Sequence, residues 1–88
     1  ERKEALALSK SLQLAEKLIS QGEKKVGKVI SKMKEFIESH PLCEVDYIEI
    51  LDFENLEEIE KIEGTILIGI AVKLGQTRLI DNKILEVK

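Results

Sequence analysis

The sequence has few of the residues that disulfides, metal clusters and aromatic cores require. It contains one cysteine, Cys43, one proline and no tryptophan, and aromatic residues make up 3% of the chain. A single cysteine excludes an internal disulfide and a cysteine metal cluster, and it is typical of the reducing cytoplasm, where we place the protein. No apolar run approaches the about 20 residues that span a bilayer, and no signal peptide is recognisable, so we expect no membrane partner.

Length and charge narrow the class of protein further. The chain has 88 residues, of which 35% are charged and 43% hydrophobic, and its net charge is −3. These values are typical of one globular domain, residues 1–88, with a single thin core. Lys24, Lys28 and Lys32 would align on one helix face, but no arginine or aromatic residue is interleaved with them. A solvated face is therefore the better interpretation, and we expect no nucleic-acid partner.

The N-terminal half predicts two amphipathic helices. Residues 1–21 contain neither glycine nor proline, and Gly22 is suited to end the helix in a left-handed conformation. Residues 23–39 repeat the pattern, and Pro41 follows. One residue between the helices predicts a tight antiparallel or angled pair. The apolar stripes are Ala5, Leu8, Leu12, Ala15, Leu18 and Ile19 in the first helix, and Val26, Val29, Ile30, Met33, Phe36 and Ile37 in the second.

Residues 64–74 predict a central strand with two unlike faces. Bulky apolar residues occupy its even positions, from Ile66 to Leu74, and are expected to fill a core because side chains alternate along a strand. The odd positions are mostly small or polar. Around Gly69 and Ala71 that face is low enough for a second surface to approach.

The neighbouring segments predict two further strands and one ambiguous connection. Residues 42–52 read as a strand that either carries a bulge or is covered on both faces, because Val45 and Ile48 fall on opposite sides. For residues 53–63, a short helical turn and a bare loop both remain open. Residues 75–76 form a turn, and residues 78–85 predict the third strand. The result is an α+β fold in which two helices pack on one face of a three-stranded antiparallel sheet, in the order ααβββ.

Most polar signals favour ordinary structural roles. Ser9-Lys10-Ser11 resembles the end of a phosphate-binding lysine loop, but it falls inside a predicted helix, where the backbone amides cannot point at phosphate. We therefore expect these three residues on a solvated helix face. His40 has no nucleophile at a recognisable spacing. The carboxylates between residues 44 and 58 follow no metal-loop pattern. We therefore expect no catalytic residue, no metal ligand and no bound cofactor in this chain.

One group of residues is less easily dismissed. Thr77, Arg78, Asp81 and Asn82 bring four polar side chains into six residues beside the most apolar strand. An arginine and an aspartate placed in this way can form a paired, hydrogen-bonded network. Alternatively, these residues fix the turn and a strand end, for which Asn and Asp are favoured. We take them as candidates for contact with another domain.

Four segments, in order, resemble the C-terminal domain of the pantothenate synthetase family. They are ERKEALALS at residues 1–9, VDYIEI at 45–50, IEG at 62–64 and LGQTRLIDN at 74–82, the last being the most specific. The likeness covers essentially the whole chain. Glu58 departs from the family, where proline is frequent, and this predicts a looser or more helical bend at that position.

The resemblance implies a parent ligase that joins pantoate to β-alanine with ATP and Mg²⁺, through a pantoyl-adenylate. In that family the substrates lie mainly on a Rossmann-like N-terminal domain, whose motifs match no position here. The implied role is a lid over the adenylate, with the missing N-terminal domain as partner and the isolated chain inactive. Self-association through the uncovered sheet face is a further expectation. The alternative function is a free-standing, non-catalytic protein-interaction module.

Overall fold

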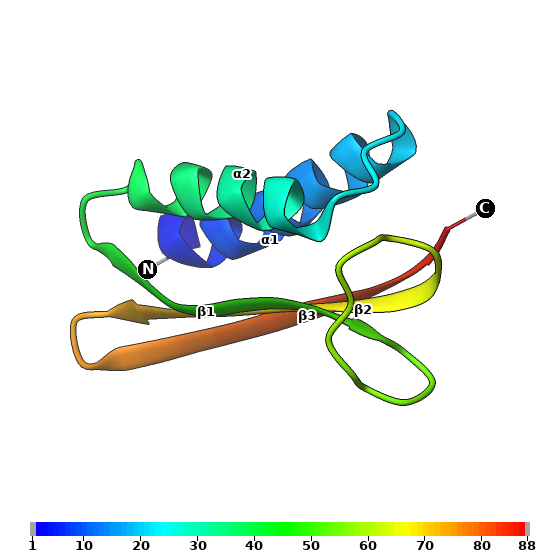
Figure 1. Cartoon of the computed structure of the whole chain (residues 1–88). Helices are drawn as coiled ribbons and strands as arrows, with labels where there is room; N and C mark the ends of the chain where they lie inside the picture. The colour runs from blue at the N-terminus through cyan, green and yellow to red at the C-terminus, as the bar shows by residue number, and fades with distance from the viewer. Residues whose placement is uncertain (1, 88) are drawn as a thin grey trace.

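The helices and strands occur in the predicted order and form two layers. The computed structural model describes residues 2–87, with side chains from residue 6 onward. Both helices lie on one face of the sheet (Figure 1), whose strand order is β1-β2-β3 with antiparallel neighbours. The predicted α+β fold is confirmed. The elements are α1 (Arg2–Ser20), α2 (Val26–Glu38), β1 (Cys43–Asp52), β2 (Gly64–Leu74) and β3 (Thr77–Val87).

The core lies between the helices and the even positions of β2. Ile66, Ile68, Ile70 and Val72 are completely buried, as their alternation predicted. Leu74, at the hairpin end, is half-buried. The same core contains five apolar residues of α1, Ala7, Leu8, Leu12, Ala15 and Ile19, and four of α2, Val26, Val29, Met33 and Ile37. Ala5, the first residue of the predicted α1 stripe, lies outside the residues whose side chains are described.

The end of α1 follows the sequence prediction, but the start of α2 does not. Gly22 has φ 103° and donates its N–H to Ile19, while the Glu23 N–H reaches back to Leu18, which is the hydrogen-bond pattern of a glycine-terminated helix. α2 begins at Val26 and not at residue 23. The reason is non-local: residues 24–26 exchange backbone hydrogen bonds with residues 60–62. The helices are therefore joined by five residues, and the one-residue connection was wrong.

Of the two alternatives for β1, the bulge is correct. The pairing of β1 with β2 shifts between Val45 and Tyr47, so Asp46 is the extra residue. This shift places Val45 opposite Val72, on the same side of the sheet as Ile48 and Ile50. The bulge thus returns every large aliphatic residue from Val45 to Ile50 to the helix-covered side.

The 53–63 connection is a loop, and the helical alternative was wrong. Its residues form turns and isolated bridges, including one between Leu51 and Glu58, so Glu58 brings no helical bend. Ile62 is completely buried and its N–H donates to the Lys24 carbonyl at 2.7 Å. The connection is thereby held against the α1–α2 loop. β3 is also longer than predicted, because it pairs with β2 from Thr77 to Val87.

Candidate functional site

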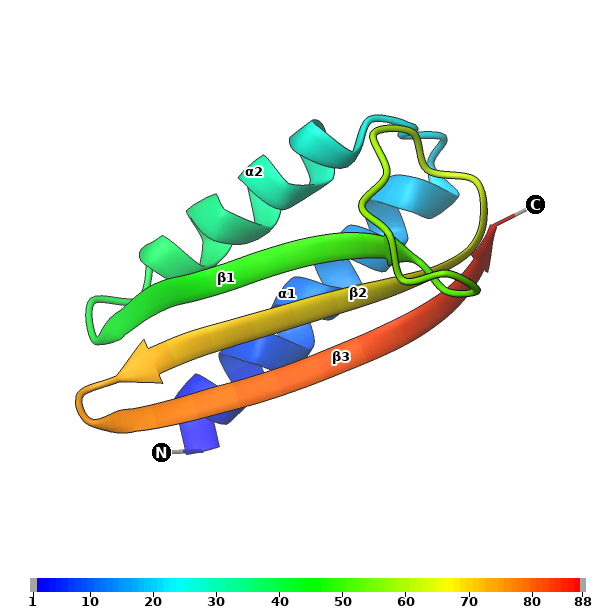
Figure 2. The same ribbon diagram turned by 60° about the horizontal axis from the view of Figure 1, so that its bottom comes forward.

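The sheet face turned away from the helices, here called the open face, has no covering layer among residues 2–87. Figure 2 looks onto it, with the helices behind the sheet. Strand register and alternation assign its residues. They are Glu44, Tyr47, Glu49 and Leu51 on β1; Thr65, Leu67, Gly69, Ala71 and Lys73 on β2; and Arg78, Ile80, Asn82, Ile84 and Glu86 on β3.

The exposed apolar part of the open face lies on β3 and not on β2. Ile80 and Ile84 are 59% and 51% exposed, whereas Ala71 is completely buried. A Cβ placed on Gly69 would lie 3.5 Å from Glu49 Cγ and 3.8 Å from a ring carbon of Tyr47. The low region expected around Gly69 and Ala71 is therefore occupied by side chains of β1, and the open surface is displaced towards the β3 edge.

Arg78 links the two outer strands across this face. Its Nε lies 2.9 Å from Asp46 Oδ2, and its guanidinium carbon lies 5.7 Å from the centre of the Tyr47 ring. Because β2 separates β3 from β1, the Arg78 side chain passes over β2 to make these contacts. The ion pair and the cation–π contact together hold the guanidinium against the sheet. The Arg78 and Asp46 side chains remain 50% and 30% exposed.

Asp46, the ion-pair partner of Arg78, is the extra residue of the β1 bulge. In a regular strand each of residues 45–47 would pair with one residue of β2. The register shift between Val45 and Tyr47 instead leaves Asp46 without a partner in the β1–β2 ladder. The guanidinium engages Asp46 through Nε. Half of the Arg78 side chain stays exposed beside this ion pair. Arg78 thus presents planar donors on the open face.

The structure separates the four candidate residues into two pairs. Thr77 and Asp81 lie on the helix side of β3, whereas Arg78 and Asn82 lie on the open face. Arg78 does not pair with Asp81; the Asp81 carboxylate accepts the Asn82 N–H at 2.8 Å. The sequence analysis proposed Arg78 as a contact residue, which stays a prediction, and it named neither of the two residues that Arg78 contacts in the structure. Asp46 and Tyr47 were missed, and the only signal for them was the irregular alternation in β1.

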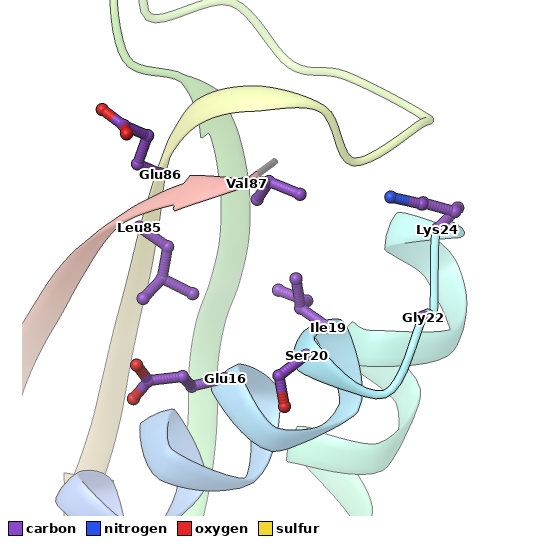
Figure 3. A pocket seen from close by; sticks show the side chains of 8 residues that line it. All are labelled: Glu16, Ile19, Ser20, Gly22, Lys24, Leu85, Glu86 and Val87. Atoms are coloured by element: carbon purple, nitrogen blue, oxygen red, sulfur yellow. The ribbon is translucent and has the colours of Figure 1, made fainter.

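A second feature is a pocket of about 390 Å³ between the end of α1 and the end of β3 (Figure 3). Its apolar lining comes from Ile19, Leu85 and Val87, and charged residues stand at its margin. One of them, Glu16, forms an ion pair with Lys83 at 3.2 Å. The pocket lacks a nucleophile paired with a base, so it offers binding space without evident chemistry.

The remaining polar signals have structural positions. The His40 ring lies 3.2 Å from the Phe36 carbonyl at the end of α2 and packs edge-on against the Phe36 ring. The solvated position predicted for Ser11 was wrong: it lies completely buried in α1, and its hydroxyl has no hydrogen-bond partner within the described part of the chain. Among residues 2–87 no three His, Cys, Asp or Glu side chains are grouped to hold a metal ion. No helix in the same range is long and apolar enough to cross a membrane.

Comparison with known proteins identifies the family. A model described as Pantoate-beta-alanine ligase matches residues 1–84. The chain belongs to the pantoate-beta-alanine ligase family. Pantothenate synthetase of Fervidobacterium nodosum is 52% identical over 86 residues, and that of Thermosipho africanus is 53% identical over 85. Pantothenate synthetase from Thermus thermophilus, a crystal structure, superimposes with a TM-score of 0.82 at 26% identity and covers 93% of this chain.

The match covers nearly all of this chain but a minor part of the relatives. It includes 98% of this chain and 30% of the Fervidobacterium nodosum protein, and it includes 29% of the Thermus thermophilus chain. The resemblance to the C-terminal domain of the family is confirmed. The larger part of the relatives has no counterpart in these 88 residues.

Proposed function

We propose that this chain is the C-terminal lid domain of an ATP-dependent ligase that condenses pantoate with β-alanine through a pantoyl-adenylate. The observation that carries the proposal is the family match over residues 1–84, combined with relatives of which the chain spans only about 30%. The activity belongs to the whole ligase, and residues outside this chain bind ATP and carry the chemistry.

A lid is a suitable role for a domain of this construction. An acyl-adenylate is destroyed by water, so an enzyme that forms one benefits from a module that closes over it. Such a module needs a stable core of its own and a surface that meets the catalytic domain. Here the core is complete on the helix side, and the open face carries exposed Ile80 and Ile84 with the fixed guanidinium of Arg78.

Mg²⁺, which the family implies, is not assigned to this domain. Residues 2–87 bring no three potential ligands together. We therefore derive no step through the ion here, and we propose that ATP and Mg²⁺ are both held by the remainder of the ligase.

The test compares three proteins: the full-length ligase, a version lacking these 88 residues, and the isolated chain. We expect the full-length ligase to make pantothenate from ATP, pantoate and β-alanine, and the isolated chain to make none. If the shortened enzyme forms AMP from ATP and pantoate, it should release more AMP per pantothenate, because the unshielded adenylate is hydrolysed. Pantothenate formation by the isolated chain would refute the proposal. A shortened enzyme that releases no more AMP per pantothenate than the full-length ligase would refute it as well.

A further inference from the structure

We propose that the open face is the surface by which this domain docks onto the rest of its own ligase, with Arg78 as the polar anchor. This inference rests on the proposed function and specifies which side of the lid faces the catalytic part. It excludes the outer surface of the helices as the docking side. The partner is a surface of the same polypeptide that combines apolar side chains with a carboxylate or carbonyl acceptor.

Exposed large apolar side chains concentrate on this side. Ile80 and Ile84 lie on the open face of β3. Phe53, the first residue after β1, is 43% exposed, and its N–H donates to the carbonyl of Thr65, a residue of the open face. Figure 1 shows the segment just after β1 reaching below the sheet, away from the helices. The helix side of the sheet, by contrast, is already filled. An apolar surface of this kind on a small domain indicates a contact site.

The segment after β1 also holds an apolar side chain in a strained position. Leu56 has φ 59°, a left-handed conformation that costs an L-residue free energy, and it is 58% exposed. Its N–H donates to the Asp52 carbonyl at 2.8 Å, and the Asp52 carboxylate accepts the Glu54 N–H. The backbone is thus fixed in a conformation that holds a leucine side chain in solvent, next to the other exposed apolar residues of this end of the sheet, and we take Leu56 as part of the contact site.

Arg78 supplies the polar part of the contact. Asp46 and Tyr47 immobilise its guanidinium, so docking costs little additional side-chain entropy. The Arg78 side chain is 50% exposed, so its planar guanidinium is accessible to a planar acceptor such as a carboxylate on a docking surface. Lys73, directly opposite Arg78, adds a second cation at this end of the face. A surface that docks here therefore needs acceptors near the β2–β3 hairpin.

The occupant is the remainder of the ligase and not a second copy. About 70% of the length of the relatives lies outside the matched part and is joined to it covalently. A tethered surface reaches effective concentrations in the millimolar range, above those of free protein copies. The open face also carries charges of both signs, Glu44 and Glu49 beside Lys73 and Arg78. Such a mixed surface fits a different protein surface with a complementary arrangement of charges.

The test measures the reactivity of single cysteines introduced into the full-length ligase. Asn82→Cys places a thiol on the open face, and Lys32→Cys places a matched thiol on the exposed side of α2. Labelling by a thiol reagent is followed for each peptide by mass spectrometry, which separates the new thiols from Cys43. With ATP, Mg²⁺ and pantoate present, we expect Asn82→Cys to react at least tenfold more slowly than Lys32→Cys.

A second pair of variants tests whether the surface is used. Ile84→Lys puts a charge into the apolar part and should restore the reactivity of Asn82→Cys and lower kcat/KM for pantothenate formation about tenfold. Leu42→Lys replaces another exposed leucine, in the turn between α2 and β1, and should change kcat/KM less than twofold.

Each other outcome overturns the inference. Equal labelling of the two cysteines in a ligase that makes pantothenate would leave the proposed function standing and refute the open-face contact. Protection of Lys32→Cys alone would show that the helices dock. Protection that grows with protein concentration would identify a second copy as the occupant. A full-length protein that makes no pantothenate would instead refute the proposed function.

Discussion

Ile68→Ala is the substitution that best tests the assignment of the two sheet faces. Ile68 is completely buried at the centre of β2, under the helices. The change removes Cγ1, Cγ2 and Cδ1, and at about 0.8 kcal/mol for each buried carbon the lost transfer free energy is about 2.4 kcal/mol. A cavity penalty adds to this, because neighbouring isoleucines collapse only partly into the space. We expect a loss of about 3–5 kcal/mol in the free energy of unfolding.

That loss is large for so small a domain. At about 0.05–0.15 kcal/mol per residue, 88 residues have a net stability of about 4–13 kcal/mol. Ile84→Ala is the matched control, since Ile84 is the same residue type on the adjacent strand, half exposed on the open face. It should cost less than about 1 kcal/mol. Urea denaturation of both variants of the isolated chain, followed by circular dichroism, measures the difference. Equal midpoints would mean that the face assignment is wrong.

Four further predictions concern individual features. Ser11→Ala should raise the free energy of unfolding by about 1 kcal/mol, because it removes a buried hydroxyl without a partner; a loss of stability would reveal an undetected hydrogen bond. Gly22→Ala should lower it by about 1 kcal/mol, since φ is 103°, and an unchanged melting temperature would argue against the left-handed helix end. Asp46→Asn should cost at most about 1 kcal/mol, as the ion pair is partly exposed, and the cost should shrink in high salt; a salt-independent cost would contradict the role of charge. The isolated chain should self-associate through the open face at high concentration, and Ile84→Lys should abolish this; sedimentation showing a monomer at every concentration would refute it.

Periodic features of this protein were readable from sequence because they are local. Alternation placed Ile66, Ile68 and Ile70 correctly on the buried face. The predicted helix stripes contain every buried apolar residue of the helices from Leu8 to Ile37, although their members Leu18, Ile30 and Phe36 are only partly buried. Gly22 ended α1 where its conformational freedom predicted. In these cases residues within one or two turns, or along one strand, determine the outcome; Ser11 is an exception, because it is completely buried although a solvated position was predicted.

Structural features that depend on contacts between distant parts of the chain could not be predicted from the sequence. The late start of α2 results from hydrogen bonds between residues 24–26 and 60–62, and no local pattern indicates such a pairing. The partner of Arg78 is Asp46, which is far away in sequence and on the opposite outer strand. Finding it requires the register of both strand pairs together with the bulge.

The small residues Gly69 and Ala71 of β2 do not make room for a second protein surface, which their size had suggested. Gly69 and Ala71 do not leave a trough for another protein, because Tyr47 and Glu49 already lie against that part of the strand. Their small size leaves room for side chains of β1 to lie over the middle strand, and one of these, Tyr47, also contacts Arg78. A large side chain at Gly69 would therefore act first on this arrangement and only indirectly on a docked partner. For this reason the docking experiment above alters Ile84, at the exposed edge, and not Gly69 at the centre.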